Sequence, residues 1–183
     1  MNFALFIITA FLGQHYSCAN TPYLDQNPAL QEYQDHASIF PLEEAWYIAY
    51  RNFESDPVFG GKAKCVRFSS NGDGEDGVYP VVLQYAPNFS ANATVTFSLS
   101  PGYSIKNVAN LEAQGQTTSV YGISAYTEVK KCSVLRLPYA GEGKCVLLVP
   151  ESKVDNIDTC CNYIFDLLCG TTSKFNIFDS SCK

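Results

Sequence analysis

Residues 94–99, TVTFSL, alternate between polar side chains and the apolar Val95, Phe97 and Leu99. This period of two is typical of a β-strand with one face buried and the other in water. Similar short runs, bounded by Gly, Pro or Asn, follow one another from residue 43 onward. The candidate strands are 45–53, 64–70, 77–86, 93–102, 103–113, 119–129, 132–140 and 144–150. Eight consecutive strands predict an all-β domain closed as an antiparallel up-and-down barrel, with room inside for one small ligand.

Three further segments surround the barrel. Residues 1–19 combine an apolar run at 3–12 with the pattern Ser17-x-Ala19, which predicts a secretory signal peptide. Residues 20–42 are polar, and we expect one short helix there, at about 28–39. After Pro150 the apolar spacing becomes helical, and Asp155 or Asp158 can cap a helix that Gly170 ends. The stripe of that helix comprises Ile157, Cys161, Ile164 and Leu168. Residues 43–183 therefore form one domain with flanking helices.

The composition argues against several kinds of partner. Twelve Lys and Arg against 18 Asp and Glu give a net charge of −6, and the basic residues form no stripe that could hold phosphates. No apolar run reaches the roughly 20 residues that span a bilayer. We therefore expect a secreted monomer that binds neither nucleic acid nor a membrane.

Cysteine usage indicates an oxidising compartment. The chain has eight cysteines, one of which, Cys18, lies in the predicted signal peptide, so seven remain. In an exported chain they are expected to form disulfides, and the odd number leaves one thiol without a partner. The sequons at Asn88 and Asn92 predict glycans at an exposed turn near a strand start.

Catalytic and metal-binding motifs are missing from the sequence. Beyond the signal peptide His36 is the single histidine, and its polar surroundings predict a solvated side chain. No Ser-His-Asp arrangement, HExxH, GxSxG or P-loop is present. The stretch 71–77, NGDGEDG, imitates a calcium loop but has Asp76 and Val82 where that loop needs glycine and glutamate, so we interpret it as an acidic hairpin tip. We expect no enzyme activity, no metal and no cofactor.

Aromatic residues are abundant, with 12 Tyr, 12 Phe and one Trp. Inward-facing rings of a barrel fill its core and also line any cavity, and pockets for small molecules are mostly apolar. The sequence thus favours a binding protein over an enzyme.

Residues 49–68, AYRNFESDPVFGGKAKCVRF, resemble the first-strand signature of the tick salivary lipocalins, which belong to the histamine-binding-protein family. The adjacent Cys160 and Cys161 and the terminal Cys182 match the same family. The resemblance implies a secreted eight-stranded lipocalin barrel with a C-terminal α-helix, which captures small host mediators or suppresses host defence. It also implies pairing of Cys65 with Cys182 and of Cys132 with Cys161; Cys145 with Cys169 is the third expected bridge, which leaves Cys160 free.

Amine-binding members carry Asp after the middle cysteine, and Glu and Trp on the next strand. This chain has Ser133 after Cys132, and Lys144 to Val146 on the next strand. A buried ammonium needs a carboxylate partner, so the missing acids favour an apolar ligand such as a sterol, cholesterol included, or a fatty acid. In this respect the chain resembles the Japanin-like branch, which acts on host dendritic cells.

Two alternatives stay open. A scavenger of histamine or serotonin would use Phe53, Asp56 and Phe59, although Asp56 before Pro57 is equally suited to cap a turn. A protein-binding decoy would use the loops at 71–77 and 114–118. For the ligand cavity the predicted lining residues are Phe53, Asp56, Phe59, Phe68, Leu83, Tyr85, Val95, Phe97, Leu99, Tyr121, Leu135 and Leu147.

Overall fold

The computed structural model describes residues 23–115 and 119–183. The predicted signal peptide at 1–19, residues 20–22 of the polar segment and residues 116–118 of one predicted recognition loop lie outside the described residues. The account of the fold below therefore starts at Tyr23.

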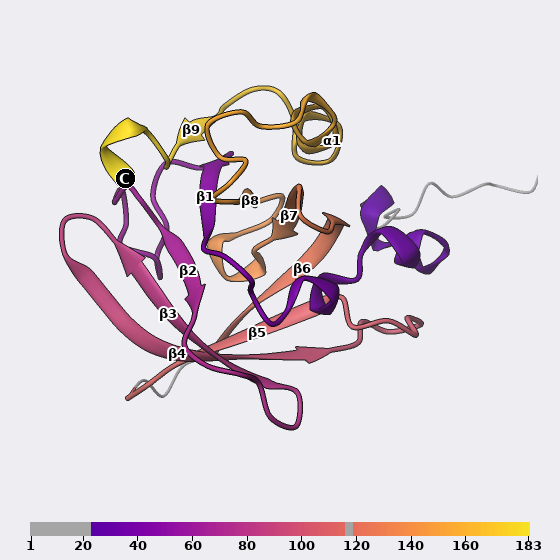
Figure 1. Ribbon diagram of the computed structural model, residues 1–183. Helices are drawn as coiled ribbons and strands as arrows, with labels where there is room; N and C mark the ends of the chain where they lie inside the picture. Colours follow the sequence, from indigo (N-terminus) through magenta and orange to yellow (C-terminus); the bar gives the residue numbers. More distant parts are fainter. Residues whose placement is uncertain (1–22, 116–118) are drawn as a thin grey trace, which may run out of the picture.

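Eight antiparallel strands form a closed barrel, as the sequence predicts (Figure 1). Each strand from β2 to β7 pairs with the next along the chain, and β1 closes the barrel by pairing with both β8 and β2. The strands are β1 (Trp46–Arg51), β2 (Arg67–Ser70), β3 (Val78–Tyr85), β4 (Phe89–Ser98), β5 (Val108–Ala113), β6 (Ser119–Glu128), β7 (Cys132–Arg136) and β8 (Cys145–Pro150). A short β9 (Phe175–Asn176) adds to the end of β1.

The strand boundaries differ from the predicted ones most in three regions. Strand β2 begins at Arg67, three residues after the predicted start, and Cys65 before it has a positive φ of 60°. Strand β4 begins at Phe89 and ends at Ser98, and β5 begins only at Val108, because a turn and loop separate them. Asn107 is buried in that loop, and its side-chain oxygen accepts the Ser100 N–H at 2.9 Å. Strand β7 ends at Arg136, before the 3₁₀ helix η4 (Pro138–Ala140), since proline has no N–H for a sheet ladder.

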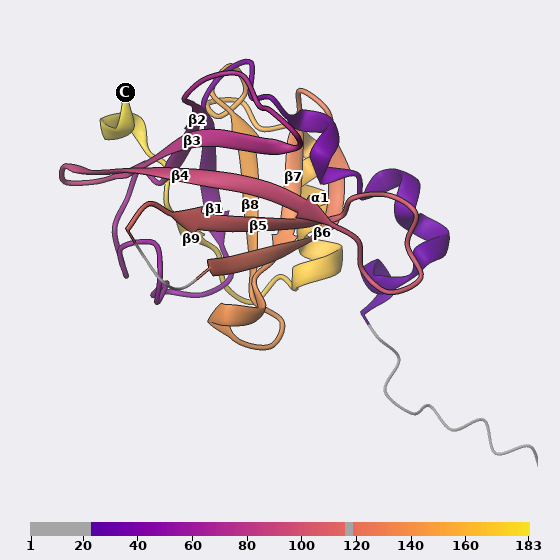
Figure 2. The same ribbon diagram turned by 90° about the horizontal axis from the view of Figure 1, so that it is seen from below.

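Two apolar clusters lie on opposite faces of the same strands. The inner cluster fills the barrel and includes Trp46, Ile48, Val146 and Leu148. The outer cluster, built from the alternate residues of β1, β7 and β8, packs beneath the C-terminal helix α1 (Thr159–Cys169). Both faces of β1 and β8 are therefore buried, and Figure 2 shows α1 on the outside of the barrel wall.

Helix α1 has the predicted ends. The Asp158 side chain accepts the Cys160 N–H at 2.8 Å, and Gly170 stops the helix with a positive φ of 84°. Its most buried residues are Cys161 and Phe165, so the buried face is turned toward Phe165 from the predicted stripe. After β9 the chain ends in the 3₁₀ helix η5 (Ser180–Cys182).

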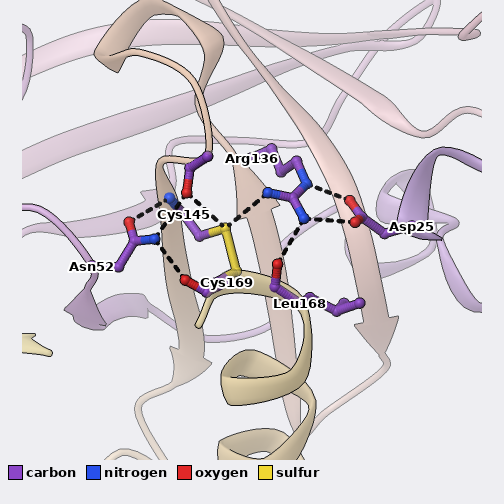
Figure 3. Close-up of a disulfide and its surroundings, with 7 residues drawn as sticks. Asp25, Asn52, Arg136, Cys145, Leu168 and Cys169 are labelled. Atoms are coloured by element: carbon purple, nitrogen blue, oxygen red, sulfur yellow. Dashed lines mark hydrogen bonds and ion pairs between the residues drawn. A yellow bond between two sulfur atoms is a disulfide. The ribbon is translucent and has the colours of Figure 1, made fainter. Parts of the chain in front are cut away.

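The polar N-terminal segment forms three short 3₁₀ helices in place of the one expected helix. They are η1 (Leu24–Gln26), η2 (Pro28–Tyr33) and η3 (His36–Ile39). Asp25 of η1 is buried and pairs with Arg136 of β7 through two contacts of 2.5 and 2.6 Å. Arg136 also donates to the Leu168 carbonyl of α1 at 2.8 Å, beside the disulfide between Cys145 and Cys169 (Figure 3).

All three expected disulfides are present. Cys65 bonds to Cys182, Cys132 to Cys161 and Cys145 to Cys169, whereas Cys160 is free and exposed. The bridges attach the C-terminal helix and tail to the barrel wall. In the described part of the chain, no helix has the length and apolar character needed to cross a membrane.

Candidate ligand-binding cavity

A cavity of about 80 Å³ lies inside the barrel. Its wall is almost entirely apolar, and no Asp, Glu, Lys or Arg lines it among the described residues. The strands supply Trp46, Ile48, Phe68, Val81, Val95, Ala109, Leu111, Val120, Tyr121, Gly122, Leu135, Val146 and Leu148. Helix η3 and the residues after it supply His36, Ile39, Phe40 and Leu42, and the opposite end supplies Phe59, Leu137 and Tyr139.

Helix η3 closes the end of the barrel where β1 begins. Phe40 packs edge-on against Phe97 at 4.9 Å between ring centroids and lies 5.4 Å from Tyr79. The His36 ring adds edge contacts to Phe40 and Phe97 at 6.1 and 6.0 Å. These rings make the closed end of the cavity dense and aromatic.

Phe59 and Tyr139 stand at the other end, because they belong to the loops that follow β1 and β7. The Phe59 ring lies edge-on to Phe68 at 5.7 Å and to Tyr139 at 6.0 Å. Burial raises the pKa of the Tyr139 phenol, and the Asp56 carboxylate raises it further. The Tyr139 phenol therefore stays neutral, and its O–H donates a hydrogen bond to Asp56 Oδ2 at 3.3 Å.

Asp56 is 1 % exposed, and protein groups occupy both of its carboxylate oxygens. Oδ1 accepts the N–H groups of Val58 and Phe59, both at 2.9 Å. Oδ2 faces Tyr139 and lies 3.5 Å from the guanidinium of Arg51. Asp56 thus caps the turn after β1 and pairs with Arg51.

Arg51 organises the same loop. It is fully buried, and its Nε and Nη2 donate to the carbonyls of Phe53 and Glu54 at 3.0 and 2.9 Å. Burial lowers the pKa of Arg51, while the nearby Asp56 carboxylate raises it. The Arg51 and Asp56 charges therefore compensate each other within the loop.

The tick histamine binding protein family matches residues 24–183. The chain belongs to this family. A male-specific histamine-binding salivary protein of Rhipicephalus appendiculatus is 25 % identical over 181 residues, which cover 87 % of this chain and 89 % of that protein.

Two solved structures share the fold. A serotonin complex of AM182 has a TM-score of 0.60 at 18 % identity and covers 90 % of this chain and 98 % of its own. Japanin of R. appendiculatus, bound to cholesterol, has a TM-score of 0.53 at 16 % identity, with coverage of 76 % and 95 %. Both comparisons support the tick lipocalin barrel.

Five of the predicted cavity residues line the cavity: Phe59, Phe68, Val95, Tyr121 and Leu135. Four others lie in the inner cluster or pack against it without reaching the cavity: Phe53, Leu83, Tyr85 and Phe97. Their inward direction is as predicted, since they follow the period-2 pattern of a barrel wall.

Three predicted cavity residues lie elsewhere. Asp56 is enclosed by its own loop, as described above. Leu147 is fully buried in the outer cluster, because its neighbours Val146 and Leu148 take the inward positions of β8. Leu99 lies one residue beyond the end of β4 and is 54 % exposed, since the period-2 pattern continues past the strand.

His36 lines the cavity, and sequence reasoning predicted its surroundings wrongly. Its side chain is not solvated: it is 3 % exposed and Nδ1 lies 3.0 Å from the Ser133 hydroxyl. One signal in the sequence could have indicated this burial: the apolar residues Ile39, Phe40 and Leu42 that follow His36. These three residues form a hydrophobic plug at the end of the barrel. His36, about one helical turn before them, is buried together with the plug.

The sites predicted on the outer surface are exposed. Asn88 lies in the turn between β3 and β4, whereas Asn92 lies within β4 opposite Val82, beyond the strand start where we expected it. Residues 71–77 connect the antiparallel pair of β2 and β3, as expected of a hairpin tip. Its acids Asp73, Glu75 and Asp76 are exposed.

Proposed function

We propose that this tick lipocalin binds a small, uncharged and largely apolar molecule inside its barrel. One observation carries the proposal: no charged side chain lines the cavity among the described residues. An apolar ligand would exchange water for contacts with aromatic and aliphatic side chains, which is favourable by about 25 cal/mol per Å² of buried apolar surface.

A biogenic amine is the second candidate, and the names of the relatives favour it. An AM182 structure is a serotonin complex, and the salivary relative is named histamine-binding. An ammonium group in an apolar cavity, however, is costly without a carboxylate beside it. The predicted counter-ion, Asp56, is paired with Arg51 and with two backbone N–H groups, which argues against this candidate.

Sterols and fatty acids are the lipid classes that we propose. The cholesterol bound to Japanin supports a sterol. A sterol suits an uncharged wall better than a fatty acid does, because a carboxylate also needs a partner. The cavity of about 80 Å³ is smaller than the roughly 300–1,000 Å³ of pockets that enclose drug-sized ligands, so a sterol would have to separate Phe59 from Tyr139.

The test combines extraction with titration. Lipid extracted from the secreted protein is identified by mass spectrometry, and cholesterol, histamine and serotonin are titrated into the emptied protein. We expect a neutral lipid in the extract and tighter binding of cholesterol than of either amine. Ala109→Phe should weaken cholesterol binding at least tenfold because its ring occupies the cavity, whereas Thr96→Phe, which faces outward on β4, should not.

The opposite outcome is equally clear. An empty cavity with submicromolar histamine binding, lost in Asp56→Asn, would replace this proposal with the amine scavenger.

We also infer that the protein is secreted in saliva and acts on host defence, dendritic cells included. Its three disulfides and its salivary relative support this. If the cavity ligand carries that activity, Ala109→Phe removes it. A protein-binding decoy would instead keep the activity in Ala109→Phe and lose it when the exposed loop 71–77 is exchanged.

A further inference from the structure

His36 is the side-chain hydrogen-bond acceptor at the closed end of the cavity. Of the residues that line it, His36, Trp46, Tyr121 and Tyr139 carry side-chain polar atoms. The Trp46 indole N–H can only donate, the Tyr139 hydroxyl is engaged with Asp56, and Tyr121 is 46 % exposed. A ligand donor that reaches the closed end therefore meets one side-chain acceptor among the described residues, the imidazole of His36.

The surroundings of Ser133 determine which ring nitrogen of His36 carries the proton. The Ser133 hydroxyl donates to the Tyr126 carbonyl at 3.2 Å, and it lies 3.0 Å from both His36 Nδ1 and Thr127 Oγ1. A serine hydroxyl has one proton and two acceptor lone pairs. The Tyr126 carbonyl can only accept, so when the Ser133 proton is directed to it, a Ser133 lone pair is left for a proton on His36 Nδ1.

The other nitrogen, Nε2, is then a hydrogen-bond acceptor. Desolvation by burial lowers the pKa of His36 to about 4, so the ring is neutral at physiological pH. A neutral ring with its proton on Nδ1 has a free lone pair on Nε2. Among the described residues none donates to Nε2, and Nε2 is not one of the side-chain atoms that are both buried from water and without a partner, so a donor inside the cavity can reach it. An acceptor in that position gains a hydrogen bond when a ligand supplies the donor.

We propose that Nε2 of His36 accepts a hydrogen bond from an uncharged donor on the ligand. The cavity would then select apolar molecules that carry a hydroxyl or an aromatic N–H, and it would bind them with that group toward η3. This inference rests on the proposed function and adds the chemical group and the direction in which the ligand enters. A hydrogen-bonding site of this kind discriminates strongly against analogues that lack the donor.

The test uses three matched ring probes: 2-naphthol, 2-methoxynaphthalene and naphthalene. They share an apolar body, and 2-naphthol alone can donate a hydrogen bond. Calorimetric titration of the wild-type protein should give about tenfold tighter binding of 2-naphthol than of the other two, the value of one net hydrogen bond. In His36→Phe, 2-naphthol should lose this advantage while naphthalene keeps its wild-type affinity.

A second measurement does not require the His36→Phe variant to bind a ligand. Nitrogen-15 NMR of the ligand-free protein distinguishes a protonated Nδ1 from a protonated Nε2, and His36 is identified as the signal missing from His36→Phe. We expect the proton on Nδ1, and in Ser133→Ala, which lacks the hydroxyl acceptor, we expect a mixture of both tautomers. A proton on Nε2 in the wild-type protein would overturn the inference.

The two proposals fail in different ways. If none of the three probes binds, the proposed apolar binding function is wrong. If all three bind equally well, or if His36→Phe still prefers 2-naphthol, the cavity binds apolar ligands but His36 does not select them.

Discussion

At the scale of single residues, the buried charges of this protein lie outside the cavity. Arg51 and Asp56 neutralise each other in the loop after β1, although Asp56 was predicted from the sequence as a cavity residue. The Asp-Pro order suits both a turn cap and a counter-ion, and sequence alone leaves the choice open. Arg51, whose pairing with Asp56 decides between the two roles, is five residues earlier. The sequence pattern predicted the strand that contains Arg51 but not the contacts of its side chain.

His36 gives the first prediction, which concerns stability against pH. Its pKa is about 4 in the folded protein and 6.5 when solvated, because burial disfavours the charged ring. Between these values the unfolded chain binds more protons, so the free energy of unfolding falls as pH drops from about 6.5 to 4. The contribution is about 3 kcal/mol, at about 1.4 kcal/mol for each pKa unit.

Urea unfolding of the wild-type protein and of His36→Phe at pH 7 and pH 4 measures this effect. We expect the stability difference between the two proteins to change by about 3 kcal/mol between these pH values, in favour of His36→Phe at pH 4. Other titrating groups cancel in the comparison. An equal loss of stability in both proteins would show that His36 is not buried in its neutral form.

At the scale of elements, β4 and β8 show where the period-2 pattern predicts the facing of side chains correctly and where it fails. Strand β4 has one buried face, and its alternation predicted Val95 correctly. Strand β8 is buried on both faces, so its run CVLLVP has no alternation and does not reveal that Leu147 faces outward. A continuous apolar run beside a cysteine is the signal that a helix covers that strand.

The second prediction concerns the contact of α1 with the barrel. Phe165 is fully buried and lies edge-on to Tyr50 at 4.8 Å. Phe165→Ala should lower the free energy of unfolding by about 3–5 kcal/mol, because it removes a ring and leaves a cavity. Tyr163→Ala on the same helix is the control: Tyr163 is 63 % exposed, and its loss should cost less than about 0.5 kcal/mol. Equal effects in urea unfolding would mean that α1 does not dock through Phe165.

At the scale of the whole molecule, the barrel, the C-terminal helix and all three disulfides could be predicted from the sequence. The strands follow from local alternation, two of the bridges follow from the family resemblance, and the third was expected between Cys145 and Cys169, two of the remaining cysteines. The N-terminal segment could not be predicted, because its residues are polar along the chain and are buried only by distant partners. Gln34 is 1 % exposed and donates to the carbonyl of Ala125, 91 residues away. Most of the cavity wall could not be predicted either: five of its 20 lining residues were, since period-2 patterns show which way a side chain faces but not how deep in the barrel it lies.

The third prediction concerns the bridge between Cys65 and Cys182, which spans 117 residues. Replacing both cysteines by serine should cost about 2–5 kcal/mol, because the unfolded chain regains freedom. The same change at Cys132 and Cys161, which are 29 residues apart, should cost about 1 kcal/mol less by loop entropy. Cys160→Ser, at the free and exposed thiol, is the control for the substitution itself. A double variant at Cys65 and Cys182 as stable as Cys160→Ser would contradict the entropic account.

Arg136 connects residues near the two ends of the described chain. Its guanidinium holds Asp25 near the start of the described chain and the Leu168 carbonyl near the end of the last helix, and it stacks 3.7 Å from the Tyr23 ring centroid. The N-terminal segment that continues into η3 is thus held from outside the barrel by the same side chain that contacts α1. Trimming either end of the protein would loosen the other. The loops at 99–107 and 141–144 also reach this junction, because Tyr103 donates to the Asp25 carbonyl and Tyr23 donates to the Glu142 carboxylate.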